Sequence, residues 1–420
     1  RSVTIQGYRT SIFHVRELER VHQTYIVAGK KHEVISIQDQ PANLSEKTGR
    51  QVFAKIPGVF VYDMDGSGNQ VNIATRGLDP HRSWEYNVRQ NGVMTNSDIY
   101  AYPASHYSPP LEAVSRIECI RGAASLQYGA QFGGMMNYVL KQPDTTEIIG
   151  FESLNSVGSF GLLSTYNAVG GKQGNFSYYA YYQKRVSDGY RDNARSDAQA
   201  QYVGVKYRFS PDLQVKAEIG RSQYVYQVPG PLTDAMFREN PRQATRSRNY
   251  FSPDIYVPSI ALEWKINRTT ALNWVNSAIL GDRSSVQFIG FADTPDTINP
   301  LSQQYKPRQV DIDHFHSYTS EIRLQKDYVA GKIHNTLVAG LRYIHNNLHR
   351  QQLGAGTTGT DFDLRLTTPQ FGRNMRLKTQ NMAFFAENLW RINPRLDLSA
   401  GVRIENGESQ MSGVIAYLPN

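Results

Sequence analysis

From residue 148 onward, the chain repeats short segments in which apolar and polar side chains alternate. Residues 198–209 alternate in this way, Ser210–Asp212 reads as a turn, and residues 212–222 alternate again. Alternation over about nine residues predicts a β-strand with one apolar face. The pattern predicts eleven strands, at 148–156, 161–169, 175–184, 198–209, 212–222, 256–266, 269–280, 316–327, 332–345, 377–391 and 395–406.

The connections between these strands alternate in length. Short turns are predicted near 170–174, 210–212, 267–269, 329–332 and 392–395, and long polar segments near 185–197, 221–256, 281–315 and 346–376. Soluble sandwiches and propellers have no reason for such a pattern. Transmembrane β-barrels of the outer-membrane type do have one, because their periplasmic turns are short and their extracellular loops are long.

The strand count predicts that this chain holds about half of a barrel. Plugged outer-membrane transporters close with about 22 strands, and the alternating pattern provides about 11. An open edge in lipid leaves backbone groups without partners, at a cost of several kcal/mol each. We therefore expect the remaining barrel strands beyond Asn420 or on another chain.

The residues before 148 follow a different, glycine-punctuated pattern. Val114–Lys141 predicts a strand, a short helix after Arg121–Gly122, a bend at Gly133–Gly134 and a second strand. Together with Ile56–Val59, Thr75–Leu78 and Gln90–Val93, this segment resembles the plug domain of TonB-dependent outer-membrane transporters. The resemblance implies an α+β plug domain inside a transmembrane antiparallel β-barrel. It divides the chain into an N-terminal extension at 1–44, the plug at 45–143 and the first half of the barrel at 144–420.

The N-terminal extension contains a candidate for the TonB box, a short extended segment that pairs with TonB in this family. Glu33, Val34, Ile35, Ser36 and Ile37 form the candidate, since extended pairing with a partner strand is how such a box binds. The alternative is that these residues are the first strand of the plug. A helix is predicted from about residue 43 to Ile56, with Ser45 as its N-cap. No signal peptide is visible before it, as expected of a mature or truncated chain.

Composition supports a membrane location. No run of about 18 apolar residues predicts a transmembrane helix, but barrel strands need none. The 26 tyrosines suit membrane interfaces. The net charge of +8 occurs without any nucleic-acid-binding signature, so anionic lipid head groups or an anionic ligand are the expected partners. The single cysteine, Cys119, excludes an internal disulfide and reads as a small buried hydrophobe.

Sequence motifs for enzymatic chemistry are absent. The chain has no nucleophile elbow, no His-Glu-x-x-His and no phosphate-binding glycine loop, so no enzyme activity and no cofactor is predicted. His314 and His316 have the spacing of two metal ligands on one strand face, but no cysteine or paired carboxylate accompanies them. We interpret them as barrel-wall residues and predict no metal site.

The resemblance is closest to the ferric dicitrate transporters. It implies plug loops at 63–69, 81–86 and 96–109 that rise toward the ligand, and an arginine-bearing loop at 240–248. Arginine grips carboxylates bidentately, which suits a multi-carboxylate anion. Phosphate contact with lipopolysaccharide is the alternative for these arginines. The predicted ligand-binding residues are Ser67, Tyr102, His106, Tyr107, Arg242, Arg246 and Arg248.

The resemblance also implies ion pairs between plug and barrel. Arg76 and Arg121 precede the two glycines of the family's Arg-Gly motifs, and plug arginines of this family meet barrel glutamates. A buried arginine needs a carboxylate because an unpaired buried charge costs several kcal/mol. Candidate partners are Glu321, Glu387 and Glu405, and the alternative is that the partners lie in the missing half of the barrel.

The function that the resemblance implies is TonB-dependent uptake of an iron chelate, ferric citrate first, across the bacterial outer membrane. The partners would be TonB with its inner-membrane energy complex, outer-membrane lipids and lipopolysaccharide, and the chelate itself. Two alternatives remain. The same fold could import another siderophore, cobalamin or a glycan, or the barrel could serve as a structural or interaction protein without transport.

Overall fold

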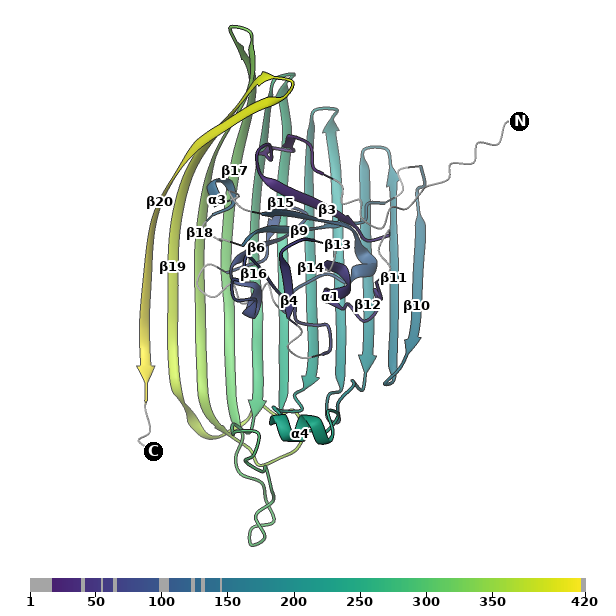
Figure 1. Cartoon of the computed structure of the whole chain (residues 1–420), viewed down its shortest axis with the longest axis vertical. Helices are drawn as coiled ribbons and strands as arrows, with labels where there is room; N and C mark the ends of the chain where they lie inside the picture. The colour runs from purple at the N-terminus through teal and green to yellow at the C-terminus, as the bar shows by residue number, and fades with distance from the viewer. Residues whose placement is uncertain are drawn as a thin grey trace, which may run out of the picture.

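A computed structural model of the chain describes residues 17–38, 42–53, 56–62, 66–97, 106–121, 125–129, 133–143 and 146–416. Its largest element is one antiparallel sheet of eleven strands, β10 to β20, paired in sequence order. In Figure 1 this sheet curves around a smaller domain, the plug, which lies against its inner face. The sheet strands are Gly150–Gly158, Leu162–Gln173, Phe176–Ser187, Ser196–Ser210, Leu213–Gln227, Tyr250–Asn267, Thr270–Gln287, Gln309–Ala330, Ile333–Gly356, Leu366–Asn393 and Leu396–Ile415.

All eleven predicted strands are present, which confirms the predicted fold class. The sheet is open between β10 and β20, as expected of part of a barrel. Short turns connect the strands at one end, called the turn end below. Long connections and the helix α4 (Asp234–Glu239) lie at the other, the loop end, which is at the bottom of Figure 1.

Most strands are longer than predicted, and the extra residues lie mainly at the loop end. The segment predicted as a loop at 346–376 is mostly strand, because β18 runs to Gly356 and β19 begins at Leu366. At these ends both faces carry polar side chains, so the alternation that marks a strand fades. Backbone pairing with the neighbouring strand continues nevertheless, with His349 opposite Arg376.

The plug contains a five-stranded sheet in the order β3-β8-β9-β6-β7 and a separate β4-β5 pair. Its elements are β3 (Lys31–Ser36), α1 (Gly49–Phe53), β4 (Val59–Tyr62), β5 (Asn72–Thr75), β6 (Tyr86–Gln90), β7 (Val93–Met94), β8 (Val114–Arg121), α3 (Ser125–Tyr128) and β9 (Gly134–Leu140). The strand–helix–strand prediction for 114–141 is confirmed. The helix predicted from about 43 to 56 is shorter, since residues 44–47 form turns before α1.

Backbone conformation explains one of the plug glycines. Gly134 has φ of +116°, and an added Cβ would lie 2.1 Å from the carbonyl oxygen of Ile120. Only glycine fits where β9 begins beside β8. Cys119 is buried in β8, as predicted, and burial raises the pKa of its thiol to about 12.

The candidate TonB box lies in the plug sheet. Glu33–Ser36 belong to β3, which pairs antiparallel with β8 from Lys31–Arg121 to Ser36–Arg116. This is the strand alternative of the sequence analysis, and it also extends the plug sheet to residues N-terminal of the predicted start at 45. A role of these residues in TonB binding stays a prediction.

The large sheet separates two faces. Along each strand, every second side chain points inward and is buried against the plug. The side chains between them point outward, and near mid-strand they are exposed and largely apolar, such as Val203, Leu341 and Leu398. Among the described residues, no helix has the length and apolar character needed to cross a membrane. Val203 and Leu398 point outward, in agreement with the apolar face that the alternation predicts, whereas Arg403 points inward and donates to the Leu126 carbonyl of the plug.

Replacing Val203 by arginine should therefore destabilise the folded protein in lipid vesicles by up to about 2–4 kcal/mol, because a charge on the outer face near mid-strand meets hydrocarbon. Urea titration of the unfolding transition measures the effect. Lys216→Arg is the control, since Lys216 faces inward beside Glu218 at 2.7 Å. Equal stability of the two variants would contradict the assignment of the faces.

Candidate functional site

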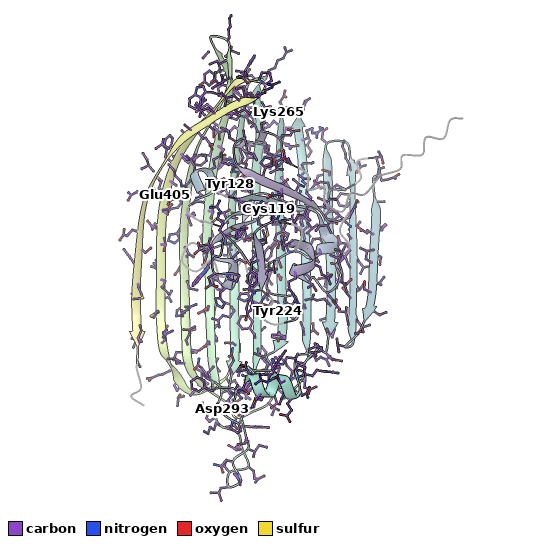
Figure 2. The ribbon with its side chains drawn as sticks, viewed as in Figure 1. Cys119, Tyr128, Tyr224, Lys265, Asp293 and Glu405 are labelled. Carbon is purple, nitrogen blue, oxygen red and sulfur yellow. The ribbon has the colours of Figure 1, made fainter. Side chains whose placement is uncertain are left out.

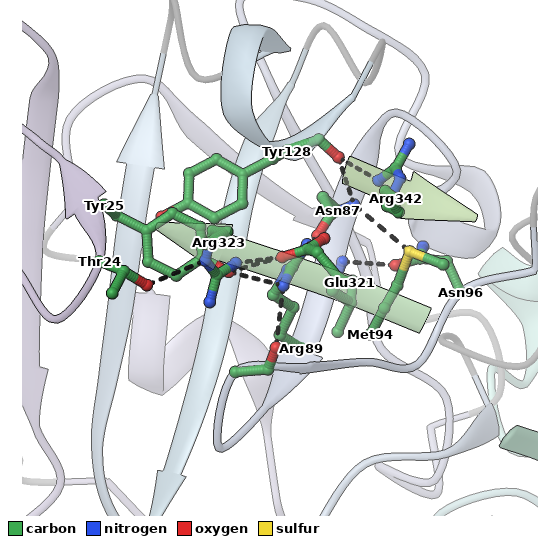
Figure 3. Close-up of polar contacts among 12 residues, drawn as sticks. Thr24, Tyr25, Asn87, Arg89, Met94, Asn96, Tyr128, Glu321, Arg323 and Arg342 are labelled. Carbon is green, nitrogen blue, oxygen red and sulfur yellow. Dashed lines mark hydrogen bonds and ion pairs between the residues drawn. The ribbon is translucent and has the colours of Figure 1, made fainter. Parts of the chain in front are cut away.

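The most extensive polar contact between plug and sheet surrounds Glu321 on β17. Its carboxylate accepts from the Tyr25 hydroxyl at 3.2 Å and from Arg89 Nη2 at 3.4 Å, and it also accepts from the neighbouring Arg323. Arg89 lies on β6 of the plug, and its side chain is 3% exposed. Figure 3 shows the carboxylate between the two guanidinium groups. Burial makes each member dependent on the others, because removing one leaves a charge without compensation.

Aromatic rings complete this contact. The guanidinium carbon of Arg323 lies 3.5 Å from the centroid of the Tyr25 ring, and that ring stacks on Tyr128 at 4.6 Å. Arg323 Nε also donates to Thr24 Oγ1 at 3.0 Å. The Tyr25 ring, from the segment before β3, therefore packs against both a cation of the sheet and a second aromatic ring. Cation–ring and ring–ring contacts are both favourable.

A second contact surrounds Glu387 on β19. Lys30 Nζ donates to its carboxylate at 2.6 Å, and both side chains are almost fully buried, at 4% and 5% exposure. Gln127 of α3 donates to the same carboxylate and exchanges two hydrogen bonds with the backbone of Ile26. The short hairpin of β1 (Val21–His22) and β2 (Tyr25–Ile26) is thereby held between plug and sheet.

These contacts correct the predicted ion pairs. Arg121 pairs within the plug, with Nε donating to Glu33 at 3.0 Å, so it does not reach a barrel glutamate. Arg76 is exposed and has φ of +59°. The predicted glutamates Glu321 and Glu387 do meet the plug, but their cationic partners there are Arg89 and Lys30, which sequence reasoning missed. Glu405 pairs with Arg403 on its own strand, β20.

The predicted ligand residues of the third plug loop lie against the inner wall of the sheet. His106 is buried, with Nδ1 2.9 Å from the Tyr224 hydroxyl and its ring 5.0 Å from that of Phe251. Figure 2 shows Tyr224 between the plug and the loop end. Tyr107 is buried beside it and donates to Gln90 at 3.2 Å. Tyr102 lies outside the described residues.

The loop of Ser67 reaches the loop end of a different part of the wall. Ser67 Oγ accepts from the backbone of Asn69 at 3.2 Å, and Asn69 donates to Ser196 at 2.7 Å where β13 begins. Arg185 of β12 donates to Asn69 and to the Glu46 carbonyl. The structure therefore brings Ser67 and His106 to the wall at separate places.

The predicted arginines of loop 240–248 have different environments. Arg246 is 2% exposed and donates to the carbonyls of Thr245, Gly290, Phe291 and Thr294. Arg248 is fully buried and holds Asp296 through two hydrogen bonds of 2.8 and 2.9 Å. Both therefore fasten loops together, and a role of either in ligand binding stays a prediction. Arg242 is exposed and lies over the rings of Phe160 and Tyr190.

Sequence reasoning missed a cationic cluster on the inner wall. Asp313 of β17 accepts from Arg283 of β16 at 2.6 Å and from Arg350 of β18 at 2.9 and 3.0 Å. Both arginines share this one carboxylate. The Arg283 guanidinium lies 5.4 Å from the Phe251 ring, which contacts His106. The sequence gives little indication of this cluster, because its three members lie on different strands and only the strand register brings them together.

Comparisons with known proteins agree with this architecture. Residues 32–135 match the model of the TonB-dependent receptor plug domain, and residues 224–413 match that of the TonB-dependent receptor-like β-barrel. Solved structures with a similar fold include the ferric citrate transporter FecA in unliganded form (TM-score 0.77, 19% identity, 92% of this chain and 57% of that one). Others are the copper transporter OprC (0.68, 14%, 95% and 56%) and BauA, the ferric preacinetobactin receptor from Acinetobacter baumannii (0.70, 13%, 95% and 61%).

The chain thus spans a little over half the length of the solved structures that it resembles. At these identities the structural likeness concerns the fold alone. The two family models carry more weight, because they match in the order in which plug and sheet occur along the chain. The chain belongs to the TonB-dependent receptor family of outer-membrane β-barrel proteins.

Proposed function

We propose that the protein of which this chain forms the plug and half of the barrel takes up an anionic iron chelate in a TonB-dependent manner, with ferric citrate as the first candidate. The observation that carries the proposal is the inner-wall cluster of Arg283, Asp313 and Arg350, which contacts Phe251 beside His106 of the third plug loop. Receptors of this family act by binding and transport rather than by catalysis. The similar fold of a ferric citrate transporter supports the choice of probe.

The chemistry of the wall suits a metal held by several carboxylates. Guanidinium groups form charge-assisted hydrogen bonds with carboxylates that are roughly twice as strong as neutral ones. His106, Tyr224 and Phe251 add polar and aromatic surface next to the cations. In the proposed site, Arg283 and Arg350 provide the charge, His106 and Tyr107 belong to the plug side, and Arg242 extends the cationic surface toward the loops.

The hairpin before β3 supplies the proposed route for energy coupling. Residues 20–30 contact both the plug and strands β17 to β20, through Arg20–Asp397, Tyr25–Glu321 and Lys30–Glu387. A pull from TonB on residues that precede this hairpin would reach these contacts before the plug sheet, whereas a pull on the candidate box at 33–37 would act on β3 first. Ligand binding would favour release of this segment only to the extent that the chelate binds the released state more tightly.

Replacing Arg350 by alanine should weaken ferric citrate binding by about tenfold, the equivalent of one charge-assisted contact. Asp313 keeps Arg283 as its partner, so the variant leaves no orphaned buried carboxylate. The measurement is titration of ferric citrate against the full-length receptor, wild type and Arg350→Ala, with the exposed Arg365→Ala as control.

The other outcomes distinguish the alternatives. Unchanged affinity of a folded Arg350→Ala variant would remove the cluster from the site. A wild type that binds no ferric citrate would favour another siderophore, cobalamin or a glycan as the cargo. Energy-dependent accumulation of radiolabelled iron in cells would separate transport from a purely structural barrel.

A further inference from the structure

The outer face of β17, β18 and β19 changes character along the strands. On β18 the outward residues near mid-strand are apolar or aromatic, Leu337, Leu341 and Tyr343, at 36%, 49% and 40% exposure. Toward the loop end the same face continues with His345, Asn347 and His349. Aromatic residues mark the borders of the lipid-facing belt in outer-membrane barrels. The histidines therefore lie just beyond the belt on the loop side.

Neighbouring strands extend this polar surface. The register places His345 opposite Tyr318, Asn347 opposite His316 and Lys378, and His349 opposite His314 and Arg376. The rings of His314 and His349 are 5.7 Å apart. A hollow of about 370 Å³ lies among these side chains. We call this surface the outer basic patch, defined by His314, His316, His345, His349, Arg376 and Lys378.

Internal partners compensate only part of the charge of the patch. Asp282 of β16 accepts from His314, and Asn374 contacts His349 at 2.8 Å. Glu408 of β20 faces the same side at the far edge, where it accepts from Gln410. Within the described part of the chain, no ion pair involves Arg376 or Lys378, and both are exposed. Two permanent cations thus stand beside four titratable imidazoles and two peripheral carboxylates.

The position of the patch determines which ligand it meets. It faces outward, away from the plug, so it is not part of the proposed chelate site. The patch lies where the head groups of the outer leaflet contact the barrel wall, and it contains no set of three His, Cys, Asp or Glu residues arranged to hold a metal among the described residues. Clustered cations at that depth attract anionic head groups, and phosphate accepts several charge-assisted hydrogen bonds at once.

We propose that the outer basic patch binds the phosphorylated head group of an outer-leaflet lipid, with Arg376 and Lys378 as the charged contacts and the histidines as additional donors. The patch lies on three adjacent paired strands, β17, β18 and β19, and does not include the open edge of the sheet.

The test uses the full-length receptor in nanodiscs of neutral phosphatidylcholine, titrated with fluorescent bisphosphorylated lipid A. The variant Arg376→Gln/Lys378→Gln removes both permanent charges and keeps the side chains polar. We expect it to bind lipid A about thirtyfold more weakly, because each basic residue near an anionic lipid surface raises the affinity roughly fivefold and the variant loses two of them. Lys326→Gln/Arg395→Gln is the matched control, since it removes two cations at the turn end and should bind as the wild type does.

Two further arms identify the ligand. Dephosphorylated lipid A with the same acyl chains should bind as weakly as the double variant does, and inorganic phosphate should compete only poorly. Equal affinity of wild type and double variant, or equal binding of the dephosphorylated lipid, would overturn the proposal. Tight binding of inorganic phosphate alone would assign the patch to a free anion instead. Ferric citrate affinity should stay unchanged in the double variant, so this test is independent of the proposed transport function.

Discussion

Replacing Glu321 by alanine should lower the free energy of unfolding by about 3–5 kcal/mol, since it removes one partner from a buried ionic contact. Two guanidinium groups, those of Arg89 and Arg323, share this carboxylate, and each is 3% exposed. Without Glu321 they would repel each other in a site with little water. Hydrogen bonds with Asn87, Thr24 and the Tyr25 hydroxyl would remain, but none of these partners carries a compensating charge.

In the Glu321→Ala variant we expect the plug to loosen from the sheet before the sheet itself unfolds. Glu321 belongs to the sheet, whereas Arg89 belongs to the central part of the plug and Tyr25 to the hairpin before it. Cys119 provides a readout, because its thiol is buried in the plug and reacts with maleimide only if the plug loosens. We expect faster labelling of Cys119 in Glu321→Ala than in wild type, together with the lower unfolding free energy.

Asp197→Ala is the control for Glu321→Ala. Asp197 also belongs to an ion pair of the sheet, with Lys184, but the two side chains are 46% and 33% exposed. Pairs of this kind contribute about 0–1 kcal/mol, since water screens both charges. Equal effects of the two substitutions would mean that the Glu321 contact does not hold the plug in the sheet.

The strands could be predicted from the sequence because one face of each must be apolar. Alternation is strong where an outward residue such as Val203 or Leu398 follows an inward polar one, and there the predicted and observed strands coincide. Near the loop end of each strand neither face has to be apolar, and both faces carry polar groups there. The continuation of β18 to Gly356 depends on backbone pairing with β17 and β19, which leaves no periodic signal in one chain segment.

The ion pairs show a different limit of prediction from the sequence. Glu321 and Glu387 were identified as candidate partners because the resemblance implies that plug arginines meet barrel glutamates, and a buried arginine needs a carboxylate. The Arg-Gly motif suggested Arg121 as one of those cations, but pairing of β3 with β8 places Arg121 opposite Lys31 and within reach of Glu33. Arg89 lies beside Val88 in a short strand whose residues are all buried, as only the structure shows. A charged residue there must find a carboxylate outside its own strand.

The arginines of the loop at 240–248 show the third limit. Their clustering was interpreted as an anion site. A guanidinium group, however, can donate hydrogen bonds to backbone carbonyls of the protein as well as to an anionic ligand. Arg246 and Arg248 instead bind the loop between β16 and β17, at residues 290–306. Arg308 continues the same arrangement by donating to the Arg248 carbonyl at 2.7 Å and to the Asp361 carbonyl at 2.8 Å. Whether an arginine is buried in a loop depends on contacts far along the chain.

Replacing Arg248 by alanine should destabilise this loop assembly by about 3–5 kcal/mol, because Asp296 would lose the only cation that its two hydrogen bonds reach in the described structure. The side chains of Arg248 and Asp296 are 0% and 3% exposed. The Arg248 guanidinium also lies 4.4 Å from the centroid of the Tyr305 ring and donates to the Lys306 carbonyl at 2.8 Å. One substitution therefore removes several of the contacts that connect the loop before β15 to the loop before β17, while those of Arg246 remain.

Limited proteolysis measures this effect directly. We expect cleavage between residues 288 and 308 to become faster in Arg248→Ala, since exposed loops are cut where local unfolding is easy. Arg238→Ala is the matched control, because Arg238 lies in the same connection but is exposed on α4. If ferric citrate binding weakened while the cleavage rate stayed that of the wild type, Arg248 would contact the ligand and the loop-fastening role would be wrong. Faster cleavage with intact barrel strands would instead show that the guanidinium holds the extracellular loops in place, and the loss of chelate affinity would then follow from loop disorder.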